Sequence, residues 1–300
     1  MLEAQWSRGN FICVGLDSDY KQIPESVQAK DKDVASTILA FNSAIVAATK
    51  DLVCAYKPNI AFYEAYGDVG WFALRETIVR IRTVAPDVPV ILDAKRADIG
   101  NTNAGYVQEA FEFLQADAIT VHPYLGAEAL QPFLARTEKG IIVLCRTSNP
   151  GAREFQDKDV LISTYGEFCD KFGSDTDRHF SVIWQDNTKY VHGPLCKYVA
   201  LQVSREWNKN GNCALDVGAT YPQELREVRG LVGDMPILIP GIGAQGGDVE
   251  KTVSAGKDSR GQGMIINSSR GIIFASKGAD FAEAARRETV KLRDTINQYR

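Results

Sequence analysis

Three charged residues of alternating sign follow an apolar run in the segment VPVILDAKRADIGNT, residues 88–102. Asp93, Lys95 and Asp98 stand where a buried strand should end, and an unpaired charge out of water is very costly. Side chains alternate along a strand, so Asp93 and Lys95 should point the same way. The pattern indicates a site in which these charges are held against one another. A purely structural ion network is the alternative.

Polar residues also end other predicted strands. Asp17 follows the first apolar run, Lys57 ends the second, and Ser148 lies just beyond the fifth. Taken alone, each could cap a turn or sit at a solvated strand end. The carboxyl ends of parallel strands in a closed barrel meet at one rim, so these residues should converge although they are far apart in the sequence.

The glycine-rich segment PGIGAQGGD, residues 240–248, and Arg270 after the last predicted strand together suggest a phosphate site. Glycines let backbone N–H groups approach an anion closely, and Gln245 can donate from its amide. The planar guanidinium of Arg270 matches phosphate oxygens. A tight turn is the alternative for the glycines alone, but barrels commonly bind phosphate at the loops after strands seven and eight.

The elements that must position these residues alternate along the chain. Eight short apolar runs are typical of strands: 11–16, 52–56, 88–92, 118–121, 140–145, 213–217, 236–239 and 263–267. Segments of helical period lie between most of them, as with Ile38, Phe41 and Ile45. The alternation predicts an α/β protein with a (β/α)8 TIM barrel and a single domain over residues 1–300. A doubly wound open sheet would need a G-x-G-x-x-G pattern after the first strand, which VGLD at 14–17 lacks.

One segment interrupts this rhythm. Residues 152–193 separate the fifth strand from its expected helix, near 194–208. The segment is polar but rich in aromatic residues, which argues against plain disorder. We expect an insertion within the barrel domain, partly ordered over the barrel mouth or flank; a loose surface loop is the alternative.

Composition excludes several classes of protein. The net charge of −4 provides no basic surface for nucleic acid, and no run approaches the ~20 apolar residues of a membrane span. The N-terminal sequence lacks the pattern of a secretory signal. Six scattered cysteines are typical of buried thiols in a reducing cytoplasm, and three histidines offer little material for a metal site.

The motif DAKRADIGNT resembles the D-x-K-x-x-D-I-x-N-T signature of the orotidine 5′-phosphate decarboxylase family, in its longer bacterial branch. Further motifs of the family are VGLD (14–17), KPNIAFYE (57–64), TSNPGA (147–152), VGATYP (217–222), PGIGAQGGD (240–248) and SSRGI (268–272). The resemblance implies a cytoplasmic homodimer of (β/α)8 barrels that converts orotidine 5′-monophosphate to UMP and CO₂ in de novo pyrimidine biosynthesis. It also implies that no metal or organic cofactor takes part.

The resemblance implies a role for each motif residue. Lys95 would be the proton donor, Asp93 the carboxylate beside the substrate's own carboxylate, and Lys57 the lysine that holds this network. Asp98 and Thr102 would cross to the site of the partner subunit. The substrate-binding residues would be Asp17 at the ribose, Ser148 at the pyrimidine ring, and Gln245 and Arg270 at the phosphate.

Two other functions stay open at this point. A metal-dependent sugar-phosphate decarboxylase or aldolase of the same superfamily would carry an acidic residue in place of Lys57. A non-catalytic nucleotide-binding barrel would belong to a different class. One residue departs from the family pattern: Asp216 stands where an apolar residue is expected, and the sequence identifies no partner for it.

Overall fold

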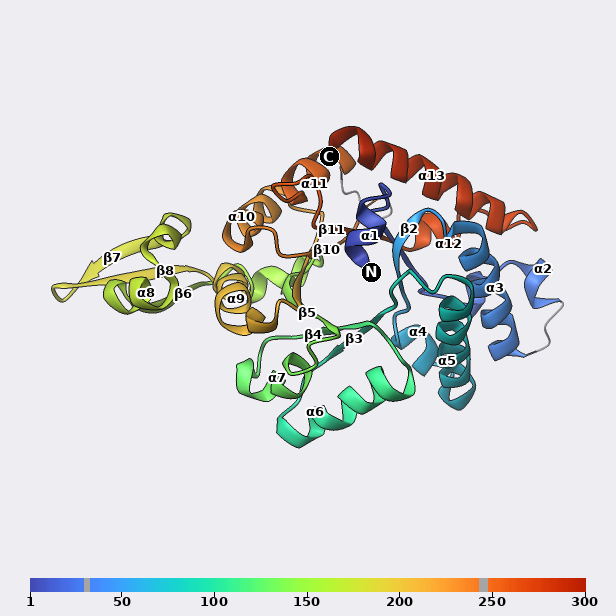
Figure 1. The fold of residues 1–300 in the computed structure, drawn as a ribbon, viewed down its shortest axis with the longest axis horizontal. Coiled ribbons are helices and arrows are strands. Elements are labelled where there is room, and N and C mark those ends of the chain that lie inside the picture. The colour runs from blue at the N-terminus through green and yellow to red at the C-terminus, as the bar shows by residue number, and fades with distance from the viewer. Residues whose placement is uncertain (30–32, 243–247) are drawn as a thin grey trace.

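Eight parallel strands form the centre of the part of the chain that the computed structural model describes, residues 1–29, 33–242 and 248–300 (Figure 1). They are β1 (Ile12–Gly15), β2 (Val53–Lys57), β3 (Ile91–Arg96), β4 (Ala118–Val121), β5 (Gly140–Arg146), β9 (Cys213–Val217), β10 (Ile237–Pro240) and β11 (Met264–Ser268). Their order is β2-β1-β11-β10-β9-β5-β4-β3. Isolated bridges from Tyr56 to Val90 and from Asn59 to Asp93 bring the outer strands β2 and β3 together, so the sheet nearly closes. The predicted (β/α)8 barrel is confirmed.

Helices cover the outside of this sheet (Figure 1). Those that alternate with the strands are α3 (Val34–Thr49), α5 (Gly67–Val84), α6 (Gly100–Val107), α7 (Gly126–Leu134), α9 (Leu195–Gln202), α10 (Pro222–Val232), α11 (Val249–Gly256) and α13 (Phe281–Tyr299). Shorter helices are α1 (Leu2–Trp6), α2 (Glu25–Gln28), α4 (Ala61–Glu64) and α12 (Arg270–Ile273). In α3, Ile38, Phe41 and Ile45 are buried, as their spacing predicts.

The strands are buried on both faces, one against the barrel interior and the other under the helices. Every residue of β1, β2, β9 and β11 is buried. Because neither face meets water, the strands read as continuous apolar runs rather than as alternating ones. Charged residues in these runs, such as Lys57 and Asp216, therefore have to be accounted for individually.

The segment after β5 forms its own small sheet, which projects from one side of the barrel (Figure 1). β6 (Asp159–Thr164), β8 (Thr188–Pro194) and β7 (Ser181–Gln185) pair antiparallel, and α8 (Tyr165–Phe172) follows β6. Asp186 and Asn187 have φ values of 46° and 59°, the left-handed pair that a two-residue hairpin turn requires. The Phe168 ring packs 5.2 Å from that of Phe172 and 5.3 Å from that of Phe180. The aromatic residues of this insertion thus supply a local core.

Candidate active site

A carboxylate held between two ammonium groups lies at the carboxyl end of the barrel. Lys57 Nζ is 2.6 Å from Asp93 Oδ2, and Lys95 Nζ is 2.6 Å from Asp93 Oδ1. The side chains of Lys57 and Asp93 are 5% and 7% exposed, whereas that of Lys95 is 47% exposed. Lys57 and Asp93 therefore form the fixed base of the cluster, and Lys95 presents its ammonium to whatever enters the site.

Neutral groups complete the setting of Asp93. Thr120 Oγ1 donates to Asp93 Oδ1 at 3.0 Å, and Asn59 Nδ2 donates to Oδ2 at 3.4 Å. Burial by itself would raise the pKa of Asp93, but the ammonium groups of Lys57 and Lys95 outweigh it and hold this pKa well below its ordinary value. Burial would lower the pKa of Lys57, and the carboxylates of Asp93 and Asp17 reverse this and raise it. Asp93 and Lys57 are thus both ionised at neutral pH.

The backbone at Lys95 is strained. Its φ is 48°, in the left-handed region that residues other than glycine rarely occupy, and the register between β3 and β4 shifts between Leu92 and Arg96. The backbone N–H groups of Ala94 and Lys95 both donate to Thr120 Oγ1 at 3.0 Å, which fixes this bend. The predicted pairing of Asp93 with Lys95 is present, but it arises from this bend and not from regular strand alternation.

Two cavities adjoin the charged cluster. Both are lined by Lys57, Asp93 and Pro240. The first, of about 170 Å³, is also lined by Asp17, Gly241, Ile242, Asn267, Ser269 and Arg270. The second, of about 390 Å³, is also lined by Lys95, Leu144, Thr147, Ser148, Asn149, Gln156, Asp216 and Leu238. Lys57 and Asp93 line both cavities, so the ion cluster lies where the two adjoin.

The smaller cavity contains the predicted anion-binding end. Arg270 is exposed at its rim, and Gly241 has a φ of 98°, which favours glycine at this turn. Asp17 Oδ1 and Asn267 Oδ1 are buried without a hydrogen-bond partner among the described residues. Such groups are rare in proteins unless a ligand or water pairs with them. Gln245, the other predicted phosphate ligand, lies outside the described residues.

The larger cavity contains Ser148, close to the glycine that follows β9. A Cβ atom on Gly218 would lie 2.8 Å from Ser148 Cβ, so only glycine lets the two loops approach this closely. Gln156, from the segment after β5, accepts from the Thr147 backbone N–H at 2.8 Å and donates to Thr147 Oγ1 at 3.0 Å. The insertion thus supplies a wall of the site through Gln156, a residue that the sequence analysis missed.

A buried arginine anchors this wall to the barrel. The Arg146 side chain is 1% exposed, and its Nε lies 2.7 Å from Asp157 Oδ1 and 3.0 Å from Glu224 Oε2. A bidentate or shared carboxylate partner suits the planar guanidinium. Arg146 therefore couples the loop that carries Thr147 and Ser148 to the first residues of the insertion.

The structure does not bring Asp98 and Thr102 to the cluster within one chain. Neither lines either of the two cavities among the described residues, and Thr102 is exposed at the start of α6. Asn103, which is fully buried, donates to the Asp98 carbonyl oxygen at 2.5 Å and accepts from the Asp98 backbone N–H at 2.8 Å. The loop that carries Asp98 is therefore held in place, and within the described part of the chain Asp98 forms no ion pair with Lys95.

Sequence reasoning assigned no role to three uncharged groups that hold Asp93 or line the site: Asn59, Thr120 and Gln156. Polar side chains of this kind occur throughout the chain, so residue type alone distinguishes none of them. Asp216 did carry a signal, as a carboxylate within an apolar run, and it lines the larger cavity. Burial, together with the nearby negative charge of Asp93, raises the pKa of Asp216 to about 7.

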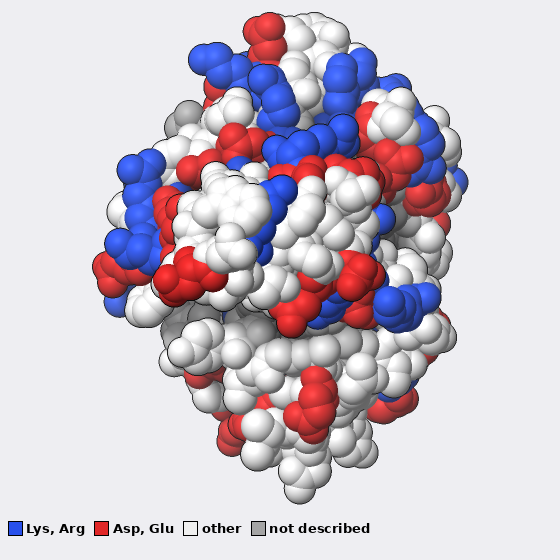
Figure 2. Space-filling model, turned by 90° about the vertical axis from the view of Figure 1, so that its left-hand side faces the viewer, with Lys and Arg blue, Asp and Glu red and all other residues white. Residues whose placement is uncertain are grey.

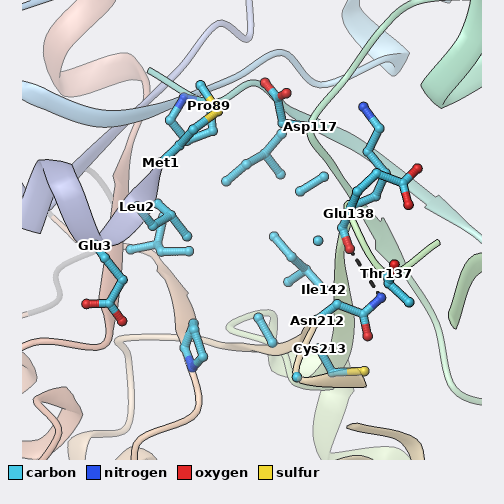
Figure 3. Close-up of a pocket in the computed structure, with 18 of the residues that line it drawn as sticks. Met1, Leu2, Glu3, Pro89, Asp117, Thr137, Glu138, Ile142, Asn212 and Cys213 are labelled. Atoms are coloured by element: carbon cyan, nitrogen blue, oxygen red, sulfur yellow. Dashed lines mark hydrogen bonds between the residues drawn. The ribbon is translucent and has the colours of Figure 1, made fainter. Parts of the chain in front are cut away.

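A further cavity, of about 400 Å³, lies at the opposite end of the barrel, where the strands begin (Figure 3). Its walls are mostly apolar, and the acidic side chains of Glu3, Asp117 and Glu138 lie around it. Lys139 lines this cavity as well, so its charges are of both signs. Active sites of (β/α)8 barrels occur at the carboxyl ends of the strands, where the ion cluster lies.

Comparison with known proteins identifies relatives over the whole chain. The model of the orotidine 5′-phosphate decarboxylase / HUMPS family matches residues 10–287. The orotidine 5′-phosphate decarboxylase of Cellvibrio japonicus is 46% identical over 297 residues, 99% of this chain and 96% of that protein, and that of Ralstonia pickettii is 46% identical over 300 residues, 100% of this chain and 97% of that protein. The solved structure of Leishmania donovani OMP decarboxylase superposes with a TM-score of 0.75 at 32% identity, covering 99% of this chain and 98% of that one. This chain belongs to the orotidine 5′-phosphate decarboxylase family.

Proposed function

We propose that this protein decarboxylates orotidine 5′-monophosphate to UMP and CO₂, the reaction that its relatives' names state, and that it does so without a cofactor. The observation that carries the proposal is the Lys57–Asp93–Lys95 cluster, in which one carboxylate contacts two ammonium groups at 2.6 Å, between two cavities. Orotidine 5′-monophosphate is negatively charged at its phosphate and at the carboxylate of its base, and this carboxylate is the group that leaves. The site offers Arg270 toward one end and Lys95 toward the other.

The chemistry requires electrostatic help. When the C6–carboxylate bond breaks, CO₂ leaves and the electron pair stays on C6 in the plane of the ring, where the π-system cannot delocalise it. The ammonium of Lys95 stabilises this pair and then transfers a proton to C6, and the half-exposed lysine regains a proton from water. Because Lys57, Thr120 and Asp93 are already held in place, little reorganisation opposes the charge that develops.

We assign the remaining motif residues to substrate binding. Asp17 would contact the ribose, Ser148 the pyrimidine ring, and Gln245 and Arg270 the phosphate. The phosphate is remote from C6, so its binding energy can be used to order the site around the reacting carbon. The two adjoining cavities support this division of the substrate along the site.

A metal-dependent reaction of the same superfamily fits these residues less well. Both oxygens of Asp93 already contact an ammonium group, and Lys57 is buried at the point where a divalent cation would need an acidic ligand.

The direct test follows the disappearance of orotidine 5′-monophosphate by its absorbance, with UMP and CO₂ identified as products. We expect the wild-type protein to turn over in excess EDTA at an unchanged rate. Binding of the nucleotide without turnover would favour a non-catalytic barrel, and loss of activity in EDTA would favour the metal-dependent alternative.

The proposal includes a cytoplasmic homodimer in which Asp98 and Thr102 complete the partner's site. The exposed apolar residues Ile99, Phe113, Tyr124 and Leu125 lie on or beside α6 and α7 and support a protein interface there. Figure 2 shows fewer charges on the lower part of the face it presents than on the upper part, and the lower part is the end of the molecule where Figure 1 places these helices. All six cysteines are free thiols, as is typical of a reducing compartment. No helix in the described residues is long and apolar enough to span a membrane.

Mixing two inactive variants tests the shared site. Lys95→Ala and Asp98→Ala disable different halves of one site, so a hybrid dimer keeps one intact site out of two. We expect the equilibrated mixture to regain up to about a quarter of wild-type activity, the statistical share for random exchange of subunits in a two-fold dimer. A mixture that stays inactive although differently tagged subunits of the two variants co-purify as hybrid dimers would contradict the crossing of Asp98.

A further inference from the structure

A carboxyl group without a partner lines the wall of the larger cavity. Asp216 is the fourth residue of β9 and is 6% exposed, and its Oδ1 is buried with no hydrogen-bond partner among the described residues. Its register partners are Leu144 in β5 and Leu238 in β10. All three residues line the same cavity as Lys95, so Asp216 faces the place where the substrate base would lie.

The surroundings of Asp216 do not favour its charge. The flanking strands β5 and β10 place leucines beside it, and the charged groups that act on it are Asp93, Lys95 and Lys57 on β3 and β2. The two ammonium groups are already engaged with Asp93. An acid that is buried beside another carboxylate and lacks a counter-ion of its own favours the neutral form. The pKa of about 7 agrees with this geometry.

We propose that Asp216 is a substrate-facing residue that must be protonated for the anionic nucleotide to bind, and that its carboxylic acid donates a hydrogen bond to an oxygen of the bound base. This inference rests on the proposed function, because it needs a substrate that brings a carboxylate into this cavity. If Asp216 were ionised, the carboxylate of the substrate would lie near two negative charges, those of Asp93 and Asp216. Neutral Asp216 removes this repulsion, and the substrate pairs with a polar group for which no described residue provides a hydrogen bond.

The test measures KM and kcat from pH 6.5 to 9 for the wild-type protein and for Asp216→Asn. The wild-type KM should rise above pH 7 and approach a tenfold increase per pH unit, because only the protonated fraction binds. Asp216→Asn cannot ionise and keeps an N–H donor, so its KM should stay flat relative to the wild-type curve. Ionisation of the substrate phosphate affects both proteins alike and cancels in the ratio of their KM values.

Two further variants separate this role from a structural one. Asp258→Asn replaces a different buried carboxylate, paired with Arg260 away from both cavities, and should keep the wild-type pH profile. Asp216→Val keeps an apolar shape between the two leucines but cannot donate, so its KM at pH 6.5 should be about tenfold higher than that of Asp216→Asn.

The inference is overturned if Asp216→Asn retains the wild-type rise of KM with pH, or if Asp216→Val binds as tightly as Asp216→Asn at pH 6.5. Each variant is first shown by thermal unfolding to be folded at the assay temperature. If the wild-type protein does not turn over orotidine 5′-monophosphate at all, the proposed function fails instead. The two failures are therefore distinguishable.

Discussion

The two ends of the barrel use polar residues differently. Where the strands begin, Asp117 accepts from the Val90 backbone N–H at 2.9 Å, and Asn212 Nδ2 donates to the carbonyl oxygens of Leu134, Arg136 and Lys139. These side chains serve the backbone. Where the strands end, Asp93 binds two ammonium groups, and Asp216 and Asp17 turn oxygens without partners toward a cavity.

This difference distinguishes a cavity that stabilises a fold from one that is suited to chemistry. Both ends are hollow, and the cavities are similar in size, about 400 and about 390 Å³. Volume therefore does not identify the site. The buried charges of Lys57 and Asp93, held in a fixed arrangement, do identify it, because burying charge costs folding free energy that a purely structural role would not require.

The largest expected effect is on the catalytic rate, after a substitution at the carboxyl end of the barrel. Lys95→Ala removes the ammonium that stabilises and protonates the carbanion, so the single-turnover rate should fall by more than the ~10⁴-fold upper range of a lone acid–base group. Lys139→Ala provides the matched control: it removes a lysine at the opposite end, bonded to the Ala116 carbonyl oxygen, and should leave the rate unchanged. A loss of only tenfold for Lys95→Ala would remove this residue from the proton-donor role.

The second effect concerns stability. Asp93→Asn leaves the ammonium of Lys57 buried with no counter-charge in contact, so the free energy of unfolding should drop by about 3–5 kcal/mol in urea titrations at pH 7. Asp117→Asn at the other end removes a carboxylate that is only partly buried, and should cost about 1 kcal/mol or less. Equal losses for the two variants would contradict the distinction drawn between the two ends.

The pKa of Asp93 predicts how this stabilisation changes with pH. It is lowered in the folded state, so the stabilisation is present above the unfolded-chain value near 4 and is lost as the pH falls further. The difference in unfolding free energy between the wild-type protein and Asp93→Asn should therefore shrink below about pH 4. A difference that does not change with pH would indicate that the loss comes from packing and not from charge.

The third effect also concerns stability, but here the free energy of unfolding falls as the pH rises. The pKa of Asp216 is raised in the folded state, so its contribution is fully present below the unfolded value near 4 and is lost as the pH rises to about 7. Relative to Asp216→Asn, the wild-type protein should lose on the order of 4 kcal/mol across this window. Urea titrations of both proteins at pH 4.5 and pH 8 measure it, and parallel curves would show that Asp216 is ionised throughout.

The smallest effect is at the exposed rim. Arg270→Ala removes a surface guanidinium at the smaller cavity, so we expect unchanged thermal stability and a KM about 10- to 100-fold higher, the range for a lost charged hydrogen bond. Arg260→Ala removes an exposed arginine that pairs with Glu3 and with the buried Asp258, away from both cavities; it serves as the control and should keep the wild-type KM. An unchanged kcat/KM for Arg270→Ala would remove this arginine from the phosphate site.

The amino-acid sequence by itself determined the (β/α)8 barrel and the placement of charged residues at the carboxyl ends of its strands. All eight predicted strands are present, because strands covered on both faces must be apolar along their whole length. The same rule made Lys57, Asp93 and Asp216 conspicuous, since a charge at the end of such a run needs a reason. Motif resemblance then assigned roles that spacing alone left open.

Only the tertiary structure decided how these groups meet. The contact of Lys57 with Asp93 spans 36 residues, and that of Thr120 with Asp93 spans 27. Gln156 is held at the site by its two hydrogen bonds to Thr147, and Lys95 reaches Asp93 through a left-handed bend. Contacts between residues distant in the chain depend on strand order and loop path, which a local sequence pattern does not encode.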